Sequence, residues 1–202
     1  MVRYLIASIM FSLLSACGSG NDSDDLPKTN FKAIASYSAA DFNLSLNVDY
    51  WELRQQYRDT DPAISASALV QLDVTDYEAL PYSITAEIDA YRNDVGFGGN
   101  CLPTACVLYI LYVIDDTLRD VTSKTALVDF FGGIDTEAEL VYYLTYAYGY
   151  QVISYDEVAG GYNVYYQLNG CSSKTWHIAF VDTNGVITGI KKVKEQKLNT
   201  EC

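Results

Sequence analysis

Two residues of this chain have the type and setting that nucleophilic catalysis requires, Cys101 and His177. Cys101 follows a glycine-rich loop at residues 96–100, and the apolar residues after it predict a helix that starts there. Backbone N–H groups at a helix N-terminus stabilise a thiolate, which lowers the pKa of a cysteine placed there. His177 opens an apolar segment and is the only histidine, so it is the candidate base. The pair predicts a Cys–His dyad that attacks an acyl carbon.

The N-terminus indicates where such chemistry would take place. Arg3 is followed by a short apolar segment, residues 4–14, and then by Leu14-Ser15-Ala16-Cys17. This order resembles the signal peptide and lipobox of bacterial lipoproteins. The resemblance implies that residues 1–16 are removed and that Cys17 carries lipid, palmitate included, which attaches the chain to a membrane. Gly18, in place of an Asp, favours the outer membrane, on its periplasmic or surface face.

The remaining chain is expected to form a tether and one domain. Residues 17–30 are small, polar and acidic, which predicts a flexible tether, and residues 31–202 contain no linker-like stretch that would divide them. The formal net charge is −13. Such an excess of carboxylates repels phosphate backbones, so we expect no nucleic-acid partner.

Four cysteines remain once Cys17 is set aside, and an exported chain meets an oxidising compartment. We expect a disulfide between Cys171 and Cys202 that holds the C-terminal tail on a sheet. Cys101 and Cys106 are then either free or bonded to each other. The chain has no CxxC pair and its one histidine is distant, so we expect no metal site, and no motif predicts a cofactor.

Periodicity predicts helices first and strands afterwards. Residues 31–60 favour a strand or extended arm followed by a short helix, and residues 65–74 a strand or the start of a helix. Helices are expected at 82–93, at 105–114 (apolar all round, hence buried), at 124–131, and from a Thr136–Glu139 capping box to Tyr148.

Alternating patterns follow Gly149 and predict strands at 150–155, 162–168, 175–181 and 186–194. Asn184-Gly185 is typical of a hairpin turn, and a two-residue turn there would place Lys192 opposite His177. Helices followed by an antiparallel sheet indicate an α+β domain.

The residues around the two candidates resemble papain-like cysteine peptidases, nearest to the bacteriocin-processing peptidases that cleave after a double glycine. The likeness rests on Asn100–Leu108, Tyr148–Val152 and Trp176–Val181. It implies a papain-like α+β fold with N-terminal helices and a buried central helix that starts at Cys101, packed on the C-terminal antiparallel sheet. It further implies that Cys101 is the nucleophile and His177 the general base of a lipid-anchored peptidase or amidase.

The alternative is a non-catalytic envelope lipoprotein that binds a peptide, an envelope component or a toxin. Leu102 stands where the peptidases have glycine, and no Asp or Asn is expected opposite His177 to orient its ring. Nine tyrosines between 142 and 166 favour either a ligand groove or the half-buried faces of a sheet. Four lysines form a basic cluster that indicates either a solvated edge strand or a surface for an acidic partner: Lys191, Lys192, Lys194 and Lys197.

Overall fold

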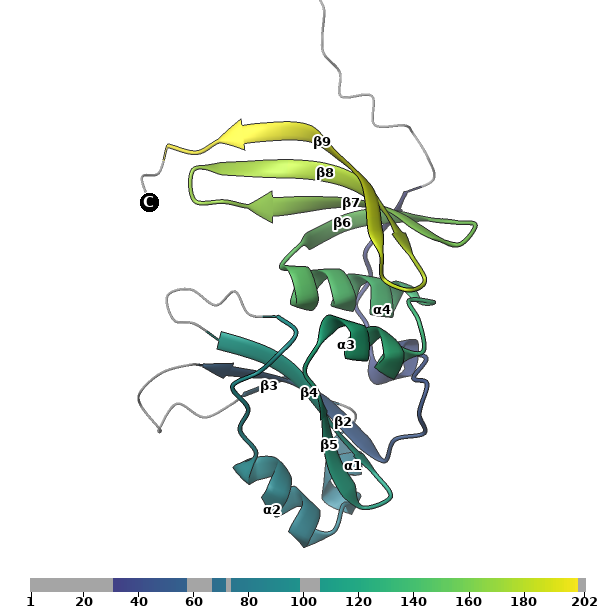
Figure 1. Ribbon diagram of the computed structural model, residues 1–202, viewed down its shortest axis with the longest axis vertical. Helices are drawn as coiled ribbons and strands as arrows, with labels where there is room; N and C mark the ends of the chain where they lie inside the picture. The colour runs from purple at the N-terminus through teal and green to yellow at the C-terminus, as the bar shows by residue number, and fades with distance from the viewer. Residues whose placement is uncertain (1–30, 58–66, 72–73, 99–105, 200–202) are drawn as a thin grey trace, which may run out of the picture.

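The computed structural model of the chain describes residues 31–57, 67–71, 74–98 and 106–199. Within them, two antiparallel sheets enclose a layer of helices (Figure 1). The first sheet has the strand order β1-β6-β7-β8-β9 and the second the order β3-β2-β4-β5. The expected α+β class is confirmed. The expected signal peptide, residues 1–16, and the tether, residues 17–30, lie outside the described residues.

The first sheet is built from β1 (Lys32–Ala33), β6 (Gln151–Val158), β7 (Gly161–Asn169), β8 (Ser173–Asp182) and β9 (Ile187–Lys197). The second is built from β2 (Tyr50–Tyr57), β3 (Ser67–Gln71), β4 (Cys106–Ile114) and β5 (Thr117–Val121). The helices are η1 (Ala39–Asp41), α1 (Val74–Ala79), α2 (Tyr82–Ala90), α3 (Lys124–Phe131), α4 (Glu137–Tyr142) and η2, a π-helix (Tyr143–Ala147).

The buried central helix expected to start at Cys101 is wrong over residues 106–114, which form β4. Cys101 itself lies outside the described residues. β4 lies between β2 and β5, and both of its faces are covered, so every side chain from Cys106 to Leu111 is buried. A strand buried on both faces is apolar without interruption, and such a run has no period that separates it from a buried helix. Its β-branched and aromatic content was the signal for a strand.

Residues 50–57 correct a second expectation, because they form β2 instead of a short helix. β2 pairs with β4 over its whole length, from Tyr50 opposite Val113 to Tyr57 opposite Cys106. Residues 65–74, for which the sequence favoured either a strand or the start of a helix, contain β3. These three strands gain their hydrogen bonds from partners distant in sequence, which local patterns do not show.

The second half of the chain follows its local signals. Ser123 caps α3, and Gly132 ends it in the left-handed conformation. Thr136 and Glu139 form the expected capping box of α4. The four predicted strands are β6 to β9. The last turn spans residues 183–185, with Asp182 N donating to Val186 O, so it is one residue longer than the two-residue turn expected at Asn184-Gly185. A register shift between Ile178 and Phe180, before the turn, offsets the extra residue and leaves His177 opposite Lys192.

The main core joins both sheets through α3 and α4, which lie between them in Figure 1. Its largest fully buried side chains include Trp51 of β2, Phe131 of α3 and Tyr166 of β7. Two smaller clusters cover the opposite face of the second sheet, where α2 contributes Ile84 and Ile88. The first sheet therefore packs against the rest of the domain through only one of its two faces.

Candidate functional site

Of the two residues of the expected dyad, the structure describes His177 and not Cys101. Cys17, Cys101 and Cys202 lie outside the described residues. Cys106 and Cys171 are both disulfide-bonded. Cys171 lies between β7 and β8, and the described residues do not include Cys202, its expected partner. Cys106, at the start of β4, has no free thiol.

His177 lies in the middle of β8, opposite Tyr166 of β7 and Lys192 of β9. The expected position of Lys192 is therefore confirmed. The imidazole stacks on the Tyr166 ring, with centroids 5.4 Å apart, and its Nε2 lies 3.0 Å from Thr175 Oγ1. Among the described residues, its buried Nδ1 has no hydrogen-bond partner. Burial, and then the charge of Lys192, lower the pKa of His177, so the ring is neutral at pH 7.

His177 belongs to a row of five aromatic rings. Its neighbour Tyr166 stacks almost parallel on Tyr150, at 4.3 Å and 7°. Tyr150 contacts Tyr148 at 5.4 Å, and Tyr148 contacts Tyr143 at 5.3 Å. The row brings together two features that were separate in the sequence, the tyrosine-rich stretch and the histidine.

Three tyrosines of this row, Tyr143, Tyr148 and Tyr150, line an open groove of about 620 Å³. The groove lies between α3, the segment after η2 and the β8–β9 turn. Val186 and Ile190 line it too and are 52% and 56% exposed. Its other lining residues are Lys124, Thr125, Val128, Asp129, Asn184, Gly185 and Ile187. Tyrosine rings and exposed aliphatic side chains thus surround a few polar groups, the usual make-up of a binding site.

Lys124 supplies the cation of the groove. Its Nζ lies 3.4 Å from the centroid of the Tyr148 ring, within the range of a cation–π contact. Lys124 takes part in neither of the two ion pairs found in the described part of the chain. Burial lowers the pKa of its ammonium, and its place in the first turn of α3 sets it against the helix dipole. A cation held in this setting favours an anionic ligand.

A hydrogen bond from Tyr143 fixes the far wall of the groove. Its hydroxyl donates to Gly185 O at 3.1 Å and lies 3.2 Å from the Tyr148 hydroxyl. Gly185 has a φ of +75°, and a Cβ added there would lie 2.8 Å from the Tyr143 hydroxyl. Burial and then Tyr148 raise the pKa of Tyr143, so its phenol stays protonated. The hydrogen bond between Tyr143 and Gly185 therefore holds the β8–β9 turn against η2.

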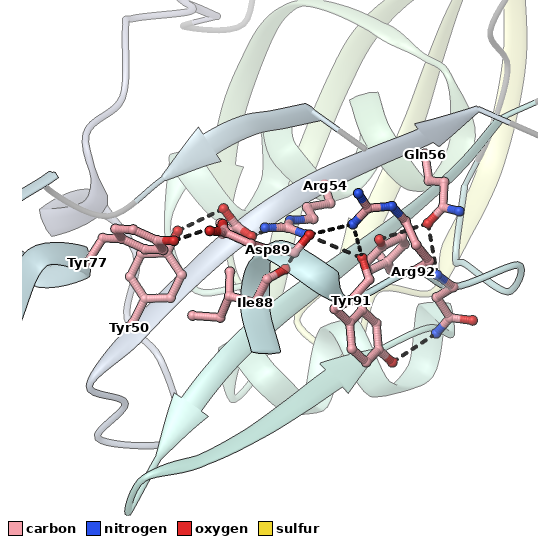
Figure 2. A network of polar contacts seen from close by, with 11 residues as sticks. Tyr50, Arg54, Gln56, Tyr77, Ile88, Asp89, Tyr91 and Arg92 are labelled. Atoms are coloured by element: carbon pink, nitrogen blue, oxygen red, sulfur yellow. Dashed lines mark hydrogen bonds and ion pairs between the residues drawn. The ribbon is translucent and has the colours of Figure 1, made fainter. Parts of the chain in front are cut away.

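A second polar cluster lies on the other sheet, where β2 buries an ion pair (Figure 2). Glu52 and Arg54 are 1% and 7% exposed. Arg54 Nε pairs with Glu52 Oε1, and Arg54 Nη1 donates to the carbonyl of Ile88 in α2 at 2.7 Å. Tyr50 donates to Glu52 Oε2 at 2.7 Å.

Further hydrogen bonds extend this cluster along α2 in Figure 2. Tyr77 donates to Asp89 at 2.8 Å, and Gln56 accepts from Asn93 N at 2.8 Å and from the Tyr109 hydroxyl at 3.1 Å. The bonds of Arg54 to Ile88 and of Gln56 to Asn93 join β2 to α2 and the segment after it, and the others link α1 to α2, β4 to β2, or residues within β2. We therefore interpret the cluster as a structural tie and not as a reaction centre.

Sequence reasoning missed Lys124, Glu52 and Arg54. A lysine directly after the Ser123 cap was visible in the sequence and runs against the helix dipole. Glu52 and Arg54, two residues apart, share one face of a strand, but that signal depends on recognising residues 50–57 as a strand.

Within the described residues, no group of three or more His, Cys, Asp or Glu side chains is arranged to hold a metal ion. None of the helices described is long and apolar enough to cross a membrane. Comparison of the chain with protein-family models, with curated proteins and with solved structures finds no match in any of the three.

Proposed function

We propose that this chain is a lipid-anchored envelope protein that binds a partner and does not hydrolyse it. The observation that carries the proposal is the open groove beside α3, with three tyrosine rings and the cation of Lys124, which forms no ion pair with any residue that the structure describes. The location rests on the lipobox at Leu14–Cys17. Aromatic side chains provide large contact areas at low entropic cost, which suits binding.

The ligand that fits this groove best is a peptide with an acidic group. Exposed Val186 and Ile190 offer contacts to apolar side chains, and Asn184 offers hydrogen bonds to a backbone. A carboxylate would take the place beside Lys124 that no described residue fills. A charge-assisted hydrogen bond in such a setting is about twice as strong as a neutral one.

Two pools of labelled, N-acetylated octapeptides test this, both rich in Leu, Val and Tyr and differing only in a central Asp or Asn. Fluorescence anisotropy should show the Asp pool binding about tenfold more tightly. Lys124→Met should remove that preference, Tyr148→Ala should weaken both pools, and Lys174→Met, a lysine outside the groove, should change neither. Equal binding of the two pools, or no binding, would contradict the proposed ligand.

The anchor is tested separately. Cells that express the full chain and grow on labelled palmitate should incorporate label, and Cys17→Ser should abolish it and release the protein from the membrane fraction. Label retained by Cys17→Ser would disprove the lipid site without affecting the groove.

A papain-like cysteine hydrolase that uses Cys101 and His177 is the second candidate. The observation in its favour is the buried Nδ1 of His177, which has no hydrogen-bond partner among the described residues. Opposed to it are β4, which takes the place of the family's central helix, and Lys192, whose charge faces the imidazole.

A thiol-directed acylating probe separates the two candidates. A hydrolase would be labelled at Cys101 in the folded state, and Cys101→Ala and His177→Ala would both lose the label. We expect no labelling of the native chain and, in peptide maps made without reductant, no free thiol at Cys101. Labelling that depends on His177 would overturn the non-catalytic proposal.

A further inference from the structure

The face of the first sheet that points away from the helices contains an unexplained row of apolar side chains. Side chains alternate along a strand, and on β8 Ala179 and Val181 are buried in the core. Trp176, Ile178 and Phe180 therefore lie on the opposite face. All three are half-buried and belong to none of the three core clusters.

Lysines border this row. Lys194 of β9 lies opposite Trp176, with its Nζ 5.0 Å from the ring centroid, and Lys191 lies opposite Ile178. Lys174 precedes Trp176 by two residues and shares its face. We call Trp176, Ile178, Phe180 and the three lysines the outer face.

The outer face carries fewer carboxylates than lysines. Asp156 of β6 lies on the same face, because it is opposite Asn163 of β7, which is opposite Phe180 of β8. Asp182 stands at its end, where its carboxylate accepts from the backbone N–H groups of Asn184 and Val186. In a chain with a net charge of −13, this surface is locally positive.

We propose that the outer face rests on an anionic membrane surface. Tryptophan prefers the boundary between headgroups and acyl chains, and lysine stems lie along apolar surface while their ammonium groups reach the phosphates. Each lysine near an anionic bilayer strengthens binding about fivefold. A lipid on Cys17 would add a second attachment, but the outer face binds without it and without the groove.

The chain itself contains a reporter for this contact. It has two tryptophans, and Trp51 is fully buried in the core, so a response to lipid comes from Trp176. The probe is a vesicle of 30% phosphatidylglycerol in phosphatidylcholine, compared with pure phosphatidylcholine. The protein is chain 17–202 with Cys17→Ser, which removes both the signal peptide and the lipid.

We expect co-sedimentation with the anionic vesicles alone, with a blue shift of tryptophan emission that Trp176→Phe abolishes. The triple variant Lys174→Gln, Lys191→Gln, Lys194→Gln should bind about a hundredfold more weakly. A matched triple variant neutralises three lysines that register places on the helix-facing side of the same sheet, and it should keep most of the affinity: Lys32→Gln, Lys192→Gln and Lys197→Gln.

Four results would overturn the proposal. Equal losses in the two triple variants would mean general electrostatic attraction, and binding without a change in Trp176 emission would place the contact elsewhere. Binding to poly-glutamate but not to the vesicles would identify an acidic polypeptide as the partner. Dimers in sedimentation velocity that Trp176→Ser dissociates would make the face an interface between two copies.

Discussion

Arg54 and Lys124 are two cations withdrawn from water in different ways. Arg54 is 7% exposed and pairs with Glu52, and Ile88 O accepts a further hydrogen bond from it. Lys124 lies on the Tyr148 ring at the edge of an open groove, in neither ion pair of the described chain. The first cation has its partners inside the fold, and the second lacks a carboxylate partner among the described residues, where we propose that a ligand binds.

This difference distinguishes a charged group that stabilises the fold from one that we propose binds a ligand. Removing one member of a buried ion pair leaves an uncompensated charge and costs stability. Removing a cation from an aromatic face loses little, because that contact is worth about 0.5–1 kcal/mol at an exposed site. Stability measurements on matched variants can therefore test the comparison directly.

Arg54→Met should have the largest effect, a loss of about 3–5 kcal/mol in the free energy of unfolding, because Glu52 stays buried without its cation. Urea denaturation followed by circular dichroism measures it. The double variant Glu52→Gln, Arg54→Met removes both charges and should recover most of the loss. A single-variant loss below about 1 kcal/mol would contradict the structural role of the pair.

Gly185→Ala should cost about 2–3 kcal/mol, because it combines a strained backbone with a clash against Tyr143. Gly189→Ala is the matched control: its φ is +62°, but nothing lies within 4 Å of an added Cβ, so backbone strain alone should cost about 1 kcal/mol. Thermal unfolding of the two variants isolates the cost of the close contacts with Tyr143 and Val128. Equal losses would show that these contacts do not hold the groove wall.

Lys124→Met should change the free energy of unfolding by less than about 1 kcal/mol in either direction, since methionine keeps the contact with the Tyr148 ring. The same urea titration as for Arg54→Met measures it. A loss above about 2 kcal/mol would place Lys124 in the same structural class as Arg54 and end the contrast between them.

The smallest effect concerns His177, whose pKa is lowered from 6.5 by burial and by Lys192. Below pH 6.5 His177 is protonated in the unfolded chain but stays neutral in the folded chain. The free energy of unfolding therefore falls as pH drops from 6.5 to the pKa of His177 in the folded chain. NMR titration of the single histidine should give a pKa under 6.5, and His177→Gln should flatten the stability curve in that window. A pKa above 6.5 would mean that a carboxylate faces the ring.

Local signals predicted the second half of the chain well. The Ser123 cap, the Thr136–Glu139 capping box and the Asn184-Gly185 turn each act within a few residues, so the sequence alone located α3, α4 and the hairpin of β8 and β9. The alternation after Gly149 located the remaining strands. The caps and the turn depend on hydrogen bonds made within a few residues, and the strands show a side-chain period within the segment itself.

The sequence by itself determined the class of the fold and the presence of one imidazole among many tyrosines, and it supplied Leu14–Cys17, which resembles a lipobox. Only the tertiary structure decided that residues 106–114 form a strand, because a segment covered on both faces shows no period. It also decided which tyrosines line a groove and that, within the described part of the chain, Arg54 forms an ion pair and Lys124 does not. Those outcomes depend on packing between segments far apart in the chain, which no local pattern encodes.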